Sequence, residues 1–102
     1  MNRSAGPAQR AAAGAVARTI DHAVARQRLE VTGTVTAIRT LHRGGPRTEV
    51  DLADGTGVLT LIFFGRRGLP GLHTGSCLVV EAVVADAYGR LEAYNPTYRF
   101  VE

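Results

Sequence analysis

From residue 28 onward, hydrophobic and polar residues alternate with the two-residue period of a β-strand that buries one face. Leu29, Val31 and Val35 mark the buried face of a first strand, which is expected to run to about Arg39. Gly33 lies inside this strand, where a glycine often marks a bulge or a sharp bend. The pattern therefore predicts a strand that bends enough to serve two sheets.

The same alternation predicts four further strands. They are expected over 48–52, over Val58–Phe64, over Cys77–Ala85 and from Leu91 to Tyr94. Asp54-Gly55-Thr56-Gly57 is a strong signal for a tight hairpin between the second and third strands. The segment from 65 to 76 contains four glycines and Pro70, so it holds at most a short turn of helix.

Five strands with the longest break between the third and the fourth are typical of a small Greek-key barrel. The order of three strands, a turn or short helix, and two more strands favours an OB-fold over an SH3-type barrel. Tyr94, Tyr98 and Phe100 are expected to close the barrel rather than contact a ligand. Outward-facing positions are Glu49 and Asp51 on the second strand, Ile62 and Phe64 on the third, and Val79 and Val83 beside Glu81 on the fourth.

Residues 1–27 differ in composition from the rest, because alanine dominates them. Pro7 suits the first turn of a helix, and Val16, Ile20 and Val24 recur at every fourth position. We expect a helix from about 8 to 24 that packs on the barrel. The fold class is thus all-β, a five-stranded Greek-key OB-fold barrel over 28–102 with an N-terminal alanine-rich helix.

The charge of the chain is concentrated in its N-terminal segment. All 12 basic residues are arginines, and the formal net charge of +3 belongs to residues 1–27, because residues 28–102 hold eight arginines and eight carboxylates. A strong nonspecific polyanion binder is usually more basic. Cys77 is the single cysteine, and no apolar run approaches the ~18 residues that span a bilayer. We therefore expect a cytoplasmic protein without an internal disulfide or a membrane partner.

Four motifs, in this order and spacing, resemble the OB-fold nucleic-acid-binding domains of the tRNA-anticodon and helicase type. They are Val31–Val35, Asp54–Gly57, Leu59–Phe64 and Asn95–Tyr98. The run Phe64-Gly65-Arg66-Arg67 is similar to small stand-alone actinobacterial OB-fold proteins, and Asn95–Tyr98 is similar to the close of the wedge domain in RecG-type helicases. The resemblance covers residues 28–102 and implies a single-strand-binding groove on the outer face of the first three strands.

The candidate nucleic-acid-binding residues are arginines and aromatic residues around this groove: Arg39, Arg43, Arg47, Phe64, Arg66, Arg67, Tyr88 and Arg90. Guanidinium groups pair with phosphates and stack on bases, and aromatic rings stack on bases. Each has an alternative role. The N-terminal helix could cover Phe64, Tyr88 could be an ordinary exposed turn residue, and the two arginines at 66 and 67 could be solvated loop residues.

Two functions stay open. The first is weak binding of single-stranded or unpaired DNA, or of RNA, although Glu49 and Asp51 would repel phosphate from the centre of the groove. The second is a protein-interaction module in which Val79, Val83 or the N-terminal helix binds a partner chain. The neutral barrel favours the second function, and the rim arginines favour the first.

Catalysis finds little support in the sequence. His22, His42 and His73 fall in separate segments, without the spacing of a metal-binding helix. The chain also lacks a nucleophile elbow and the lysine of a phosphate-binding loop. We therefore expect no enzymatic activity, no cofactor and no metal.

Overall fold

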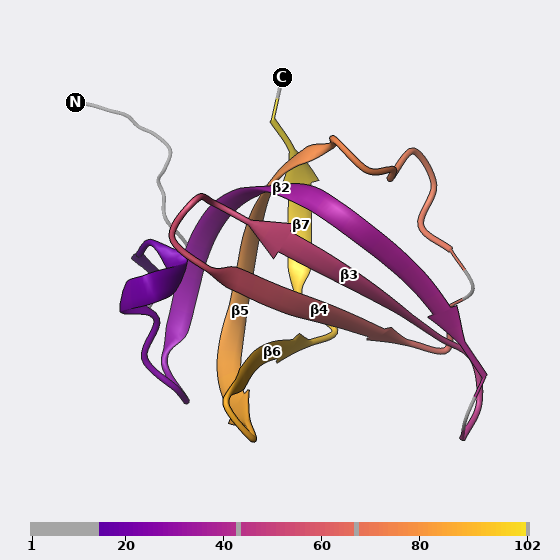
Figure 1. The fold of residues 1–102 in the computed structure, drawn as a ribbon, viewed down its shortest axis with the longest axis horizontal. Helices are drawn as coiled ribbons and strands as arrows, with labels where there is room; N and C mark the ends of the chain where they lie inside the picture. Colours follow the sequence, from indigo (N-terminus) through magenta and orange to yellow (C-terminus); the bar gives the residue numbers. More distant parts are fainter. Residues whose placement is uncertain (1–14, 43, 67, 102) are drawn as a thin grey trace.

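The alternating pattern forms one curved sheet in the computed structural model, which describes residues 15–42, 44–66 and 68–101 (Figure 1). Its strands are β1 (Val16–Ala17), β2 (Arg28–Leu41), β3 (Arg47–Ala53), β4 (Val58–Phe64), β5 (Cys77–Ala87), β6 (Arg90–Tyr94) and β7 (Thr97–Phe100). All five predicted strands are confirmed, although several are longer than expected. The sheet has seven strands rather than five, because the short β1 and β7 are added at its two edges.

The strands pair in the order β1-β2-β3-β4-β6-β5-β7, and β2 also pairs with β5. This last pairing joins β2, next to one edge of the strand order, to β5, next to the other edge. The pairs β2–β3, β3–β4, β5–β6 and β2–β5 are antiparallel, whereas β4 and β6 run parallel over three residue pairs. The Greek-key crossover therefore lies between β4 and β5, as the long break in the pattern predicted.

The N-terminal segment forms no α-helix over the described residues 15–24, so this part of the helix prediction is wrong; residues 8–14 lie outside the described residues. A 3₁₀ turn, Ile20–His22, takes its place. Ile20 is only 2% exposed, but Val16 and Val24 are exposed, so the expected apolar stripe does not exist. The Ile20 backbone N donates instead to Asp54 Oδ2 at 2.8 Å, which satisfies it without a helix.

Gly33 lies where β2 changes partners. Residues Arg28–Thr34 of β2 pair with β5, and Thr34–Leu41 pair with β3. A Cβ atom at Gly33 would lie 2.7 Å from the Ala53 carbonyl oxygen, so the glycine permits a close approach of two backbones. The register shift itself falls between Val35 and Ala37, beyond the predicted position.

The interior side chains form one hydrophobic cluster. Its strand members are Leu29, Val31, Val35, Val50, Leu52, Leu59, Leu61, Phe63, Leu78, Val80, Ala82, Val84 and Ala93. Ile20 packs against Gly57 just before β4, and Leu69 from the segment after β4 completes the core. The strand faces predicted from the alternation are thus confirmed for the interior of the sheet.

Candidate nucleic-acid interface

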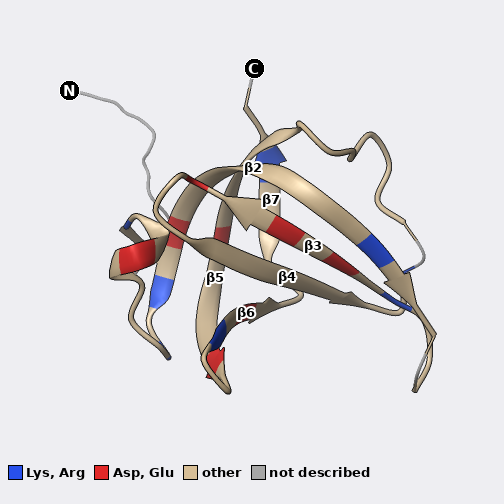
Figure 2. Ribbon diagram, in the orientation of Figure 1, with Lys and Arg blue, Asp and Glu red and all other residues tan. Residues whose placement is uncertain are grey.

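The outer face of β2, β3, β4 and β6 carries most of the candidate residues. Strand register places Arg39 opposite Glu49, and Arg47 opposite Phe64. Thr60 lies between Asp51 on β3 and Glu92 on β6. Acidic positions on β3 therefore lie beside a basic position on β2, as Figure 2 shows.

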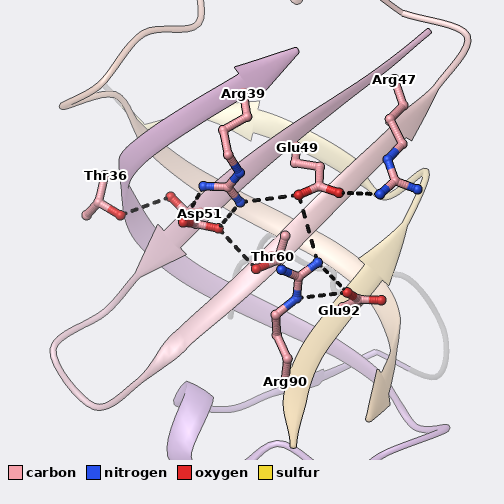
Figure 3. A network of polar contacts seen from close by, with 8 residues as sticks. All are labelled: Thr36, Arg39, Arg47, Glu49, Asp51, Thr60, Arg90 and Glu92. Carbon is pink, nitrogen blue, oxygen red and sulfur yellow. Dashed lines mark hydrogen bonds and ion pairs between the residues drawn. The ribbon is translucent and has the colours of Figure 1, made fainter. Parts of the chain in front are cut away.

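Arg39 is held by two carboxylates on β3 (Figure 3). Its Nη1 and Nη2 donate to the two carboxylate oxygens of Asp51, each at 2.9 Å, and Nη2 lies 3.4 Å from Glu49 Oε1. The hydrogen bonds from Arg39 outweigh burial and hold the pKa of Asp51 below its ordinary value. This two-bond geometry is the one with which arginine also binds phosphate.

Glu49 is the centre of the same network. It is only 3% exposed, and Arg47 Nη2 donates to its Oε2 at 2.8 Å. Arg90 Nη2 lies 3.8 Å from Glu49 Oε1 and donates to Glu92 Oε2 at 2.5 Å. Burial raises the pKa of Glu92, but hydrogen bonds from Tyr94 and Arg90 outweigh it, so this pKa lies below its ordinary value.

Three candidate arginines are thus paired with three carboxylates. Arg39, Arg47 and Arg90 neutralise Glu49, Asp51 and Glu92 within the folded chain. Glu49 and Asp51 lie on the outer face of β3, as predicted. The arginines cover Glu49, however, so its side chain is buried rather than exposed. A phosphate that approaches this face must therefore compete with carboxylates for the same guanidinium groups.

An aromatic pair lies at the end of β4 and β6. The rings of Phe64 and Tyr94 are stacked, with centroids 6.0 Å apart and planes 13° apart. Phe64 is 50% exposed, and among the described residues the N-terminal segment packs at the opposite end of β4, against Gly57. The predicted outward position of Phe64 is confirmed, while its contact with a base stays a prediction.

The expectation that Tyr94 helps to close the barrel is wrong. Ala93 is fully buried, so its neighbour Tyr94 points outward and is 48% exposed. The Tyr94 hydroxyl donates to Glu92 Oε1 at 2.5 Å. Phe100 is also exposed at the end of β7, whereas Tyr98 is partly buried and packs edge-on against Phe63, as expected.

Tyr88 lies at the tip of the hairpin between β5 and β6. Tyr88 and Gly89 form the two-residue turn, with φ angles of 55° and 83°, and Gly89 N donates to Asp86 Oδ1 at 2.9 Å. Two positive φ angles are the signature of a type I′ turn, which favours asparagine or glycine. Tyr88 is fully exposed, so neither packing nor turn geometry explains a tyrosine there.

Arg66 is exposed in the segment that follows β4. Its backbone oxygen accepts a hydrogen bond from Thr48 Oγ1 at 2.8 Å, which holds the backbone of Arg66 against β3. Its guanidinium group has no carboxylate partner among the described residues. Of the predicted arginines that the structure describes, Arg66 therefore differs from the paired residues of the network; Arg43 and Arg67 lie outside the described residues.

A groove of about 600 Å³ runs beside the network, between the N-terminal segment and the hairpin of Tyr88. Its charged lining residues are Arg39, Arg90, Asp21 and Asp51, so their charges balance. Sequence reasoning missed the contribution of Asp21, because it assigned this residue to a helix. It also missed Glu92, whose place opposite Thr60 depends on the parallel pairing of β4 with β6.

No three histidine, cysteine, aspartate or glutamate side chains come together as metal ligands in the described part of the chain. Over the same residues, no helix has the length and hydrophobicity needed to cross a bilayer.

No protein-family model and no curated protein matches this chain. Solved structures do match it. The replication factor A related protein from Methanobacterium thermoautotrophicum is 23% identical with a TM-score of 0.63, and the match covers 85% of this chain and 92% of that chain. The second OB-fold domain of replication protein A from Methanococcus maripaludis is 16% identical with a TM-score of 0.65, covering 85% and 96%. The chain has an OB fold.

At these identities the likeness shows the OB fold alone. The predicted order of OB-fold strands is confirmed by β2 to β6, with the crossover in the expected place. The finer resemblance to tRNA-anticodon domains, to RecG-type wedge domains and to actinobacterial proteins stays a prediction. These likenesses therefore assign no role to any single residue of this chain.

Proposed function

We propose that this chain is a nucleic-acid-binding OB-fold module that binds single-stranded or unpaired DNA, or RNA, weakly across β3, β4 and β6. The observation that carries the proposal is the set of groups left available on and beside this face: the stacked rings of Phe64 and Tyr94, the exposed Tyr88, and Arg66, which has no carboxylate partner among the described residues. Aromatic platforms beside arginines are the usual means of holding single strands. The proposal includes no catalysis, cofactor or metal.

The comparisons support this class of function. The two solved structures described above belong to a replication factor A related protein and to a replication protein A. The fold alone allows other roles, so the support comes from the fold together with the exposed rings and arginine. We also propose that the protein acts in the cytoplasm.

The ion-pair network sets the expected strength of binding. Arg39, Arg47 and Arg90 each contact a carboxylate, so their charge does not attract phosphate from a distance. With about three phosphate contacts, the logarithm of affinity should fall with the logarithm of salt concentration with a slope of about −2 for a single strand. Affinity should be micromolar or weaker at physiological salt, because little electrostatic attraction is left.

Titration of a fluorescent oligothymidylate of about 15 nucleotides, at several salt concentrations, tests the proposal. Arg66→Ala should weaken binding and make the salt slope shallower by about one unit. Arg99→Ala is the matched control, because Arg99 is an exposed arginine on β7, away from this face. The same titration with oligouridylate compares RNA with DNA. Absence of salt-dependent binding at low ionic strength would overturn the proposal.

A protein-interaction module is the second candidate. Val83 on β5 is 45% exposed and Val79 is partly exposed beside Glu81, as predicted, and the groove is neutral. Val79→Ser and Val83→Ser should each reduce binding to a partner chain, and Val79→Ser should leave oligonucleotide affinity unchanged, because Val79 does not line the groove. A chain that binds no oligonucleotide but associates with a protein through Val83 would favour this function.

A further inference from the structure

A second cleft lies next to the aromatic pair. It has a volume of about 510 Å³ and is formed by the β6–β7 turn, β5 and the segment that leads into β2. The lining residues that matter here are Arg26, Arg28, Glu81, Val83, Tyr94 and Asn95. Its size falls within the ~300–1,000 Å³ of pockets that bind small molecules.

The charge of this cleft is not balanced. Arg28 Nη1 lies 3.7 Å from Glu81 Oε2, which is a long ion pair between partly exposed side chains. The guanidinium of Arg26 has no carboxylate partner among the described residues. The cleft therefore holds one arginine more than its carboxylate can neutralise.

The backbone fixes Arg26 at the edge of the cleft. Its N–H donates to the Val84 carbonyl oxygen at 2.7 Å, and Gln27 O accepts from Val84 N at 3.4 Å. Arg26 itself has a φ of 72°, which is uncommon for a residue other than glycine. This bend ties the segment before β2 to β5, so the position of Arg26 is set by the sheet.

Tyr94 is the aromatic wall of the cleft. Phe64 stacks on Tyr94 from β4, on one side of β6, whereas Val83 and the other β5 residues of the cleft lie on the other side of β6. Val83, which is about half exposed, adds an apolar surface. A flat ring placed in the cleft would extend the stack that Phe64 and Tyr94 begin.

We propose that this cleft binds a nucleotide, with the base stacked on Tyr94 and against Val83, and the phosphate bound by Arg26 and Arg28. Neither a phosphate nor an apolar ring alone uses both features. The nucleotide could be free or could belong to a single strand that leaves the groove over Phe64 and Tyr94. The strand version rests on the proposed function, whereas the free-nucleotide version does not.

Amide chemical-shift titration with adenosine 5′-monophosphate tests the cleft directly. The nucleotide should shift the amides of Arg26, Val83 and Thr97, and adenosine or inorganic phosphate alone should bind at least about fivefold more weakly. Arg26→Gln should weaken nucleotide binding about fivefold to tenfold, because it removes the charge and keeps the length. Arg99→Gln is the matched control and should bind like the wild type.

Two variants separate stacking from hydrogen bonding at Tyr94. Tyr94→Phe keeps the ring and loses only the bond to Glu92, so nucleotide affinity should stay within about twofold. Tyr94→Ala should lower it about tenfold or more, and an unchanged melting temperature shows that the fold is retained. Nucleotide binding that is equal in the wild type, Arg26→Gln and Tyr94→Ala would overturn the proposal, as would absence of binding.

Oligothymidylate distinguishes this inference from the proposed function. If Arg66→Ala and Tyr94→Ala weaken oligonucleotide binding while Arg26→Gln does not, the strand does not enter the cleft, and the strand version of this inference fails while the groove proposal stands. If the oligonucleotide does not bind but the mononucleotide binds through Arg26 and Tyr94, the groove proposal fails and the cleft is a free-nucleotide site.

Discussion

The groove and the cleft beside Tyr94 use the same residue types in different ways. In the groove, Arg39 donates to Asp51 twice at 2.9 Å, and each arginine of the network has a carboxylate partner. In the cleft, the nearest ion pair of Arg28 is 3.7 Å long and Arg26 has none among the described residues. The number of arginines therefore overstates the positive charge available to a ligand, because carboxylates within the sheet neutralise part of that charge.

Cross-strand register explains this difference. On β3, Glu49 and Asp51 share one face and lie directly beside the arginine of β2. Opposite charges in such positions stabilise a sheet. Arg26 precedes β2 and lies beside Val84, an apolar neighbour. The arginines of the groove are thus paired with carboxylates across the strands, whereas Arg26 in the cleft has no carboxylate partner among the described residues.

The largest expected effect is on the free energy of unfolding, and it comes from weakening the contact of the N-terminal segment with the sheet at the border of the groove. Ile20→Ala should lower the free energy of unfolding by about 2–4 kcal/mol, because Ile20 is a buried member of the core. Urea denaturation followed by circular dichroism measures it. Val24→Ala is the control and should change little, since Val24 is exposed. Equal stability of both variants would mean that the segment is not docked.

Tyr88→Gly should separate binding from stability in the groove. Removal of the ring should weaken oligonucleotide binding by about 1–3 kcal/mol. The free energy of unfolding should stay the same or rise by up to about 1 kcal/mol, because glycine adopts the positive φ of this turn without strain. A variant that is as stable as expected but binds like the wild type would assign Tyr88 to the turn alone.

Removing carboxylates should make the groove resemble the cleft. The double variant Glu49→Gln and Asp51→Asn should strengthen oligonucleotide binding by about 1 kcal/mol at low salt and steepen the salt slope. Affinity is measured per folded molecule, because the network also stabilises the sheet. Glu30→Gln, which removes one negative charge at the start of β2 where the double variant removes two, is the control. Unchanged affinity in the double variant would place the strand elsewhere.

The smallest effect concerns acid stability. The pKa of Asp51 is lower in the folded chain because Arg39 donates to it, so its contribution to stability is complete above about pH 4 and is lost as pH falls toward the folded pKa. Asp51→Asn should flatten this part of the stability curve, by less than about 1 kcal/mol because the pair is partly exposed. Denaturation midpoints between about pH 2 and 6 measure it. An identical curve in the variant would show that the pair contributes nothing.

The period of two predicted the strands and their buried faces, because this alternation depends only on neighbouring residues. The N-terminal segment could not be predicted in the same way. Its backbone groups are satisfied by Asp54 and Thr56, more than 30 positions away. Alanine content favoured a helix locally, and the contacts of Ile20 with the hairpin outweighed it.

The candidate arginines could be identified from the sequence, but their pairing could not. The contact of Arg39 with Asp51 requires the register of β2 on β3, and that of Arg90 with Glu49 requires the parallel pairing of β4 with β6. Tyr94 was misplaced although a signal existed: Ala93 and Leu91 alternate with it as the inward or half-buried residues of β6.

Amide chemical-shift mapping with oligothymidylate at low salt shows directly whether ligand contacts gather where aromatic rings are exposed and where arginines have no carboxylate partner among the described residues. The expected result is that the largest shifts occur at Phe64, Arg66, Tyr88 and Tyr94, with smaller shifts along the paired arginines of the network. Shifts confined to β7 and Val79, or no shifts at all, would contradict it.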